Sequence, residues 1–221
     1  MNEINISYLV TCHNEGKQIS NLLDLLFEYK NENEIVILDD YSTDVTTCNY
    51  FSGFKWYEFP SENVSFHQHA LNNDYGAHKN YGNSLCKGKY IFQIDADETP
   101  HEVLLTNLKT ILDANPAVDL FWVPRINRFE GITPDDINRW SWRMNEKGWV
   151  NHPDYQARIY RNHPDVKWHR KLHETITGMK SYAHLPASEE LSLYHDKTIE
   201  KQRSANERYN RDFSKEDNMR L

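Results

Sequence analysis

Polar and acidic residues follow the predicted strands of this chain at the point where each strand ends. The strand predicted at 4–10 is followed by His13-Asn14-Glu15. The strand predicted at 34–38 is followed by Asp39-Asp40, and the strand predicted at 89–94 is followed by Asp95-Ala96-Asp97. In open parallel sheets the carboxyl ends of the strands form the ligand-binding edge. Carboxylates gathered there repel one another unless a cation or a donor-rich ligand lies among them. The pattern therefore predicts a ligand site at one sheet edge.

Strands alternate with helices over the first half of the chain. Apolar residues recur at helical spacing over 19–27 and 100–112. A helix is also predicted at 76–87, ended by Gly88, and a further strand at 55–59. This alternation predicts an α/β fold, with a mainly parallel sheet flanked by helices. After residue 118 the pattern predicts strands at 119–123, 155–160 and 190–194 and a charged helix at 197–213. No Gly/Ser-rich linker separates the halves, so we expect one domain over 1–221, with residues 118–221 covering the sheet.

Composition excludes several classes of protein. The chain has 221 residues, a net charge of −8, and three cysteines without a C-x-x-C pair, which argues against a disulfide framework or a cysteine-rich zinc site. No apolar run approaches the ~20 residues of a membrane span, and Asn2 and Glu3 are unlike the start of a signal peptide. We expect a folded cytoplasmic protein. Phosphate-loop, dinucleotide-binding and nucleophile-elbow signatures are all missing from the sequence.

The D-x-D tripeptide suits a divalent cation. Side chains alternate along an extended segment, so Asp95 and Asp97 lie on the same side. Mg²⁺ typically takes one or two carboxylates together with substrate phosphates. A D-x-D that follows a buried strand, near Asp39 and Asp40, is therefore expected to hold Mn²⁺ or Mg²⁺ bound to a diphosphate.

Four ordered motifs resemble those of family-2 glycosyltransferases with the GT-A fold: 10–15 (VTCHNE), 37–44 (ILDDYSTD), 79–82 (KNYG) and 94–98 (IDADE). Two later segments, 149–161 and 172–174, are similar to the branch that contains lipopolysaccharide-core β-glucosyltransferases. The resemblance covers nearly the whole chain. It implies a Rossmann-like sheet, with a nucleotide-sugar-binding half at 1–117 and an acceptor-side, catalytic half at 118–221. One departure is Tyr41, which stands where the family usually has glycine.

The resemblance also implies roles for individual residues. For the donor nucleotide it implies Thr11 and Glu15 as pocket walls, Asp40 at the uracil or ribose, Lys79 as a nearby basic group, and Asp95 at the ribose or a metal-bound water. For the metal it implies Asp97 as a ligand, with His195 or the competing His173 as the residue that completes the metal coordination. For the chemistry it implies Asp154 as the general base. Further candidates around these positions are Asn14, Asp39, Arg158 and Trp149.

Each of these residues also has a purely structural interpretation. Asp154 could pair with Arg158 or Arg161, Lys79 could be a solvated helix charge, and either histidine could be a structural one. Asp39 could be a turn acid, Asp44 a helix N-terminal acid, and the tryptophans core residues. The basic residues of 197–213 could form a solvated face, or contact a donor pyrophosphate or an anionic acceptor.

The leading hypothesis is a metal-dependent, inverting glycosyltransferase that moves a sugar from a UDP-sugar to a hydroxyl acceptor. The resemblance favours a lipopolysaccharide-core or other surface glycan, as a glycan or glycolipid acceptor, made at the inner face of the membrane through peripheral contact. A phage-type enzyme acting on hydroxymethylated bases in DNA is the alternative, although a net charge of −8 disfavours tight duplex binding. A non-catalytic carbohydrate-binding module is the alternative of another class.

Overall fold

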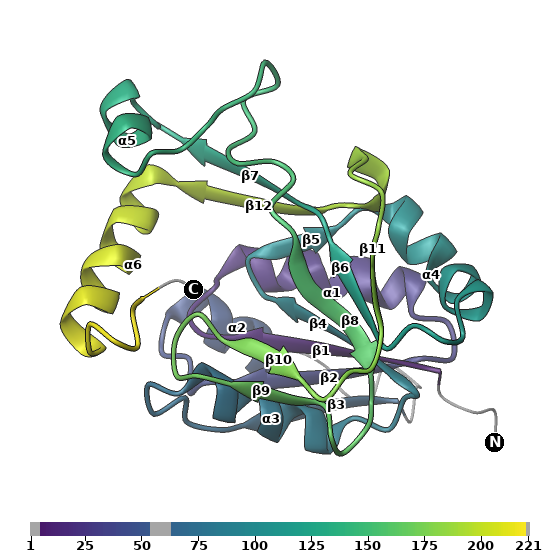
Figure 1. Cartoon of the computed structure of the whole chain (residues 1–221). Coiled ribbons are helices and arrows are strands. Elements are labelled where there is room, and N and C mark those ends of the chain that lie inside the picture. The colour runs from purple at the N-terminus through teal and green to yellow at the C-terminus, as the bar shows by residue number, and fades with distance from the viewer. Residues whose placement is uncertain (1–4, 54–62, 220–221) are drawn as a thin grey trace.

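The computed structural model describes residues 5–53 and 63–219, and its centre is a seven-stranded sheet (Figure 1). In spatial order the strands are β11 (Tyr182–His184), β6 (Leu120–Val123), β8 (Gln156–Arg161), β4 (Tyr90–Asp95), β1 (Ile6–Cys12), β2 (Glu34–Asp39) and β3 (Val64–Gln68). The pairs β4–β1, β1–β2, β2–β3 and β11–β6 are parallel, and β8 runs antiparallel to both of its neighbours. The sheet is therefore mainly parallel, as predicted. Strands from both halves of the chain hydrogen-bond within it, whereas the assignment of a function to each half stays a prediction.

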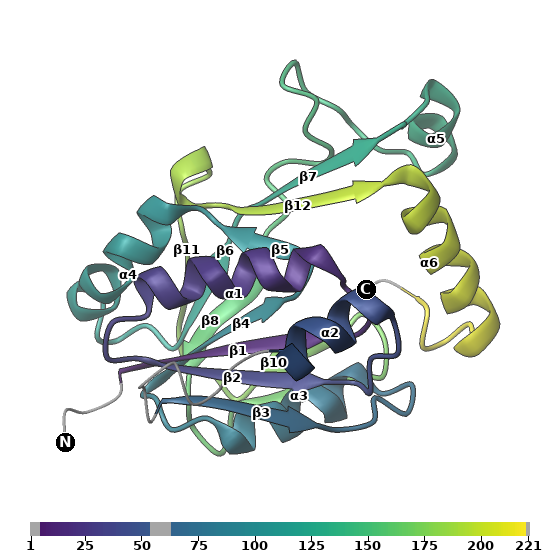
Figure 2. The same ribbon diagram turned by 180° about the vertical axis from the view of Figure 1, so that it is seen from behind.

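Helices cover both faces of this sheet. Helices α1 (Lys17–Tyr29), α2 (Val45–Gly53) and α4 (Glu102–Ala114) lie on one face, and α3 (Tyr75–Leu85) lies on the other (Figure 2). Side chains of β1 alternate between the two layers: Tyr8 and Val10 pack in the core with α1 and α4, whereas Leu9 packs in the opposite core. Burial on both faces explains why these strands read as continuous apolar runs.

Helix α3 lies unusually close to the sheet because of its glycines. A Cβ on Gly82 would come within 2.8 Å of Leu9 Cδ2, and a Cβ on Gly76 within 2.6 Å of the backbone oxygen of Arg170. The side chain of Asp74 caps this helix by accepting from the Ala77 amide at 2.9 Å. The close approach brings the start of α3 against the hairpin of β9 (Lys167–His169) and β10 (Thr175–Thr177).

A second, smaller sheet stands beside the carboxyl ends of the central strands. It contains β5 (Glu98–Pro100), β12 (Leu193–Thr198) and β7 (Arg125–Glu130), with β12 in the middle. Helix α5 (Pro134–Arg139) follows β7, and α6 (Ile199–Asp212) continues directly from β12 and descends along the open side of the central sheet (Figure 1). The smaller sheet and α6 thus form one wall of a space whose other wall is the edge of the central sheet.

The sequence located most of these elements. The strand expected at 55–59 lies outside the described residues, and β3 is found at Val64–Gln68. The strand expected at 190–194 is wrong in its first part, because a short 3₁₀ helix occupies Glu189–Leu191 and β12 begins at Leu193. No helix in the described part of the chain combines the length and the apolar character of a membrane span.

Candidate active site

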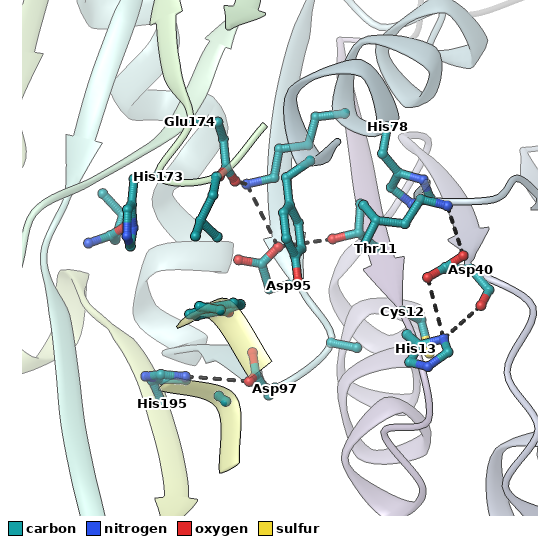
Figure 3. Close-up of a pocket in the computed structure, with 18 of the residues that line it drawn as sticks. Thr11, Cys12, His13, Asp40, His78, Asp95, Asp97, His173, Glu174 and His195 are labelled. Atoms are coloured by element: carbon teal, nitrogen blue, oxygen red, sulfur yellow. Dashed lines mark hydrogen bonds and ion pairs between the residues drawn. The ribbon is translucent and has the colours of Figure 1, made fainter. Parts of the chain in front are cut away.

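A cleft of about 1340 Å³ opens at the carboxyl ends of the central strands. Most of the predicted site residues line it, several of which are shown in Figure 3: Thr11, Asn14, Glu15, Asp40, Lys79, Asp95, Asp97, Arg158, His173 and His195. Three predicted residues are not among its lining. Asp39 and Asp154 lie directly behind it, and Trp149 lines a separate pocket with Arg143 and Met144.

The loops after β1 and β2 are tied together at one end of the cleft. Asn14 accepts from the amides of Thr43 at 2.7 Å and Asp44 at 3.0 Å, and its own amide donates to Ser42 Oγ at 2.9 Å. The buried Asp39 accepts from the Ser42 amide at 3.0 Å, as expected of a turn acid. Asn14 and Asp39 therefore shape the loops. Asp44 accepts from the Thr47 amide at 2.9 Å just before α2, as expected of a helix N-terminal acid.

Tyr41 occupies the position where the family usually has glycine, and its φ is +46°. Bulky residues rarely adopt this left-handed region, which glycine reaches without strain. The loop therefore keeps the backbone conformation that a glycine would allow, although tyrosine fills the position.

Asp40 and two histidines form the inner wall of this end. Asp40 Oδ1 accepts from the Leu71 amide at 2.8 Å, and its Oδ2 lies 3.5 Å from His13 Nδ1 (Figure 3). His78 is buried on α3, and its Nδ1 lies 3.2 Å from His69 Nδ1. Burial, with a smaller contribution from His69, lowers the pKa of His78 to about 4. His78 is therefore neutral at physiological pH.

Asp95 is neutralised by cations of the protein itself. Its Oδ2 accepts from Arg158 Nη2 at 2.6 Å, and its Oδ1 accepts from Thr11 Oγ1 at 2.9 Å and lies 4.0 Å from Lys79 Nζ. Burial favours the neutral acid, but the charges of Arg158 and Lys79 outweigh it and lower the pKa of Asp95. Arg158 also binds Glu98 through Nε and Nη2, at 2.9 and 2.7 Å. Asp95 is thus ionised but already engaged.

Lys79 is not a solvated helix charge. It is 4% exposed, donates to Glu174 on the segment before β10, and lies 4.7 Å above the ring of Trp168. Burial opposes ionisation of Glu174, but Lys79 outweighs it and lowers the pKa of Glu174. This buried pair joins α3 to the β9–β10 hairpin beneath the cleft.

Asp97 and His195 meet on the opposite wall. Asp97 Oδ2 lies 3.4 Å from His195 Nε2 and 2.8 Å from Lys197 Nζ, so residues on β12 face the second acid of the D-x-D (Figure 3). Burial raises the pKa of Asp97, but the charges of His195 and Lys197 lower it well below its usual value. Burial also lowers the pKa of His195. Asp97 is therefore an ionised carboxylate, and it lies beside an imidazole whose burial disfavours the imidazolium form.

Asn127 on β7 fixes the orientation of this imidazole. The Asn127 amide nitrogen donates to Asp154 Oδ2 at 2.9 Å, which leaves its oxygen 2.6 Å from His195 Nδ1. A carboxylate can only accept, so the amide nitrogen faces Asp154 and the amide oxygen faces the histidine. Nδ1 of His195 therefore faces the Asn127 oxygen, and Nε2 is the ring nitrogen that faces Asp97.

Asp154 is an engaged carboxylate. Its Oδ2 accepts from Arg125 Nη2 at 2.7 Å and Nε at 3.0 Å, and its Oδ1 accepts from Gln156 at 3.0 Å. Burial raises the pKa of Asp154, but Arg125 and Asn127 lower this pKa by more than burial raises it, so the carboxyl group is ionised at neutral pH. Asp154 does pair with an arginine, but Arg125 takes the place of the expected Arg158 or Arg161.

The donor atoms on this wall fit a divalent cation in part. Asp97 supplies an ionised oxygen and His195 an imidazole nitrogen, whereas Asp95 is engaged by Arg158. Within 5–53 and 63–219 no group of three or more His, Cys, Asp or Glu side chains is arranged to hold a metal. Since such cations also take substrate phosphates and water as ligands, two protein ligands are compatible with binding. Lys197 lies against one of these two ligands.

The remaining predicted residues lie around the rim. Glu15 pairs with Lys201 of α6 at 2.5 Å, and His173 Nε2 lies 3.1 Å from Asn218 Oδ1. Trp149 is 8% exposed and packs on His152, so it belongs with the structural interpretation of the tryptophans. No site role was predicted for Asn127, and Lys197 was considered only among the basic residues of 197–213 that could contact a donor pyrophosphate or an anionic acceptor. One available signal was that Arg125 and Asn127 follow the strand predicted at 119–123, at the same sheet edge.

The family model of glycosyl transferase family 2 matches residues 7–184. The chain belongs to this family. A crystal structure of TarS from S. aureus matches 87% of the chain with a TM-score of 0.62 and 18% sequence identity. The structure of TarS 1–349 in complex with UDP-GlcNAc also matches 87% of the chain, with a TM-score of 0.61 and 18% identity. TarS 1–349 in complex with UDP gives a TM-score of 0.62 at 17% identity and also covers 87% of the chain. No curated protein matches the sequence.

These likenesses establish the fold. The chain spans 37%, 58% and 60% of the three TarS chains, respectively, so it corresponds to only a part of each. The predicted GT-A architecture is confirmed. The predicted class, glycosyltransferase, is confirmed at the level of the family.

Proposed function

We propose that this family-2 chain transfers a sugar from a nucleoside diphosphate sugar, UDP-linked, to a hydroxyl group of an acceptor, with inversion at the anomeric carbon. The observation that carries the proposal is the juxtaposition of Asp97 Oδ2 with His195 Nε2, 3.4 Å apart, at the carboxyl end of the sheet. Oxygen and imidazole ligands at this edge suit a cation bound to a diphosphate. TarS, a structural neighbour, has been crystallised with UDP-GlcNAc and with UDP.

The chain's own residues divide the work of binding. Thr11, Glu15 and Asp40 form the end of the cleft where we place the nucleoside, with Asp95 toward the ribose. Lys79 supports that end from below through its contacts with Glu174 and Asp95. When bound by Asp97 and His195, Mn²⁺ or Mg²⁺ would stabilise the negative charge of the departing diphosphate.

Asp154 remains the proposed general base. Inversion in one step requires a group that removes the acceptor proton as the hydroxyl attacks the anomeric carbon. Asp154 is ionised, its side chain is 29% exposed, and its partners Arg125 and Gln156 both line the cleft. Arg125 and Asn127 hold the carboxylate in one orientation, which a base acting on a bound hydroxyl needs.

For the acceptor we propose a glycan or glycolipid rather than duplex nucleic acid. Basic side chains near the smaller sheet are already paired, as in Arg128 with Asp196 at 2.5 Å and Arg203 with Asp136 at 2.7 Å. Duplex binding needs Lys and Arg groups free to neutralise phosphates. Trp122 lines the cleft beside Gln156 and offers a flat face of the kind that suits a sugar ring.

The test is calorimetric titration of the chain with UDP, with and without Mn²⁺. We expect micromolar binding that depends on Mn²⁺ and is lost in Asp97→Ala. Asp113→Ala, an exposed acid of α4 paired with Lys109, is the matched control and must bind as the wild type does. Absence of UDP binding under every metal condition would refute the UDP-linked donor. With binding established, UDP-sugars are screened for hydrolysis and transfer, and the anomeric configuration of the product is read by NMR.

A further inference from the structure

Two lysines of the C-terminal segment bind the acids at the cleft. Lys197 on β12 lies 2.8 Å from Asp97, and Lys201 on α6 lies 2.5 Å from Glu15. The acids come from two different strand ends of the central sheet, after β4 and after β1, and α6 runs beside both (Figure 1). These two contacts, which we call the lysine clasp, hold the C-terminal segment against the sheet edge.

Lys197 is placed where it competes with a cation. Its side chain is 16% exposed, that of Asp97 is 14% exposed, and the ammonium contacts the same Asp97 oxygen that faces His195 Nε2. Asn127 holds the His195 ring so that Nε2 faces this same oxygen. Because the Lys197 ammonium already neutralises Asp97, a cation that took this carboxylate as a ligand would have to displace the ammonium or bind beside it.

The charges of the clasp balance to zero: two carboxylates and two ammonium groups. A divalent cation added alone would leave an excess of two positive charges beside Lys197 and Lys201. A nucleoside diphosphate sugar added alone would bring two negative charges toward Asp97 and Glu15. Added together, they restore neutrality, and the lysines are then free to turn from the acids to the diphosphate oxygens.

We propose that Lys197 exchanges partners during donor binding: it neutralises Asp97 while the cleft is empty, yields that carboxylate to the metal, and then binds the donor diphosphate. Lys201, which is paired with Glu15, adds a second and weaker positive charge near both ligands. This proposal rests on the proposed function for its donor and deepens it by naming the residues that couple metal to diphosphate. It makes Lys197 a diphosphate-binding residue whose resting contact lowers metal affinity.

The experiment uses Lys197→Met, which keeps much of the side-chain volume and removes the charge. Mn²⁺ binding without nucleotide is measured from the EPR signal of free Mn²⁺, and UDP binding is measured by calorimetry at saturating Mn²⁺. We expect Lys197→Met to bind Mn²⁺ about ten-fold more tightly and UDP about ten-fold more weakly, because a single positive charge beside both ligands has been removed. A purely structural role for Lys197 would weaken both.

Three further variants make the result decisive. Lys197→Arg keeps the charge and must retain Mn²⁺ and UDP affinities near those of the wild type, and Lys109→Met on α4, far from the cleft, must change neither. Lys201→Met must shift both affinities in the same two directions by a smaller factor, because Lys201 is 42% exposed. This variant carries the test if Lys197→Met does not fold.

The outcomes separate the exchange from the proposed function. Mn²⁺ affinity that is unchanged or lowered in both lysine-to-methionine variants would overturn the exchange, even if the wild type binds UDP with Mn²⁺. If the wild type binds Mn²⁺ but no UDP, the donor assignment fails. In that case tighter Mn²⁺ binding by Lys197→Met would still support competition at Asp97, and its absence would overturn it.

Discussion

Removal of the buried charge of Lys79 should destabilise the whole domain. Lys79 and Glu174 have side-chain exposures of 5% and 15%, and they join α3 to the β9–β10 hairpin. In Lys79→Met the apolar stem and its packing on Trp168 are largely kept, while Glu174 loses its only partner cation among the described ion pairs. Breaking a buried pair by removing one partner typically costs about 3–5 kcal/mol. We expect a loss of about 3 kcal/mol in the free energy of unfolding, because Glu174 keeps some access to water.

A double-mutant cycle separates this electrostatic effect from packing. Glu174→Gln removes the other charge, and Lys79→Met/Glu174→Gln removes both, so that no unpaired ion is left in the double variant. The double variant should be more stable than the sum of the two single losses predicts, by about 2 kcal/mol. Urea unfolding followed by circular dichroism gives all four values. A solvated Lys79 would give a loss below about 0.5 kcal/mol and an additive cycle, and that result would refute the buried-pair argument.

Three other predictions concern stability. Tyr41→Gly should stabilise the fold by up to about 1 kcal/mol, because glycine relieves the φ of +46° at a side chain that is 54% exposed; a loss above about 1 kcal/mol in urea unfolding would contradict this. Gly82→Ala should cost about 1–3 kcal/mol, seen as a lower Tm, because its Cβ would meet Leu9 at 2.8 Å, whereas Gly53→Ala, with nothing within 4 Å, should leave Tm within a degree or two. Stability should fall as pH drops below about 5, since the pKa values of Asp97, Asp154 and Glu174 are lowered in the fold and the unfolded chain therefore binds more protons in that range. His78 acts in the same direction from about pH 6.5 down to about 4, and a flat urea-unfolding profile between pH 7 and 4 would contradict both assignments.

The sequence was sufficient where the information is local. The strands around Leu9, Val36 and Phe92 are buried on both faces, so each one is visible in the sequence as an apolar run that stops where a polar loop begins. The acids in those loops were therefore expected at one edge of the sheet. Motif order then gave the family. The residues expected at the cleft lie there because strand ends in a parallel sheet share an edge whatever the details of packing.

The sequence failed where a residue's environment comes from a distant segment. Lys79 occupies a helix position of undistinguished pattern, and its burial depends on Glu174, which is 95 residues away. Asp154 was expected to pair with Arg158 or Arg161 by proximity along the chain, but β7 brings Arg125 to it from 29 residues before. Periodicity reports which face of its own element a side chain occupies, and it carries no information about which other element covers that face.

Cations of the folded chain itself neutralise most of the acids at the strand ends. Acids collected at one edge need positive charge, and much of it is supplied by the protein: Arg158 and Lys79 serve Asp95, and Arg125 serves Asp154 and Glu98. These partners come from β7, β8 and α3, whose own packing holds them in place. Lys197 differs, because it shares one oxygen of Asp97 with the imidazole of His195. The two acids of the D-x-D are therefore not equivalent. Asp95 is a fixed part of the charge network, whereas Asp97 is the acid at which the proposed exchange of Lys197 would take place.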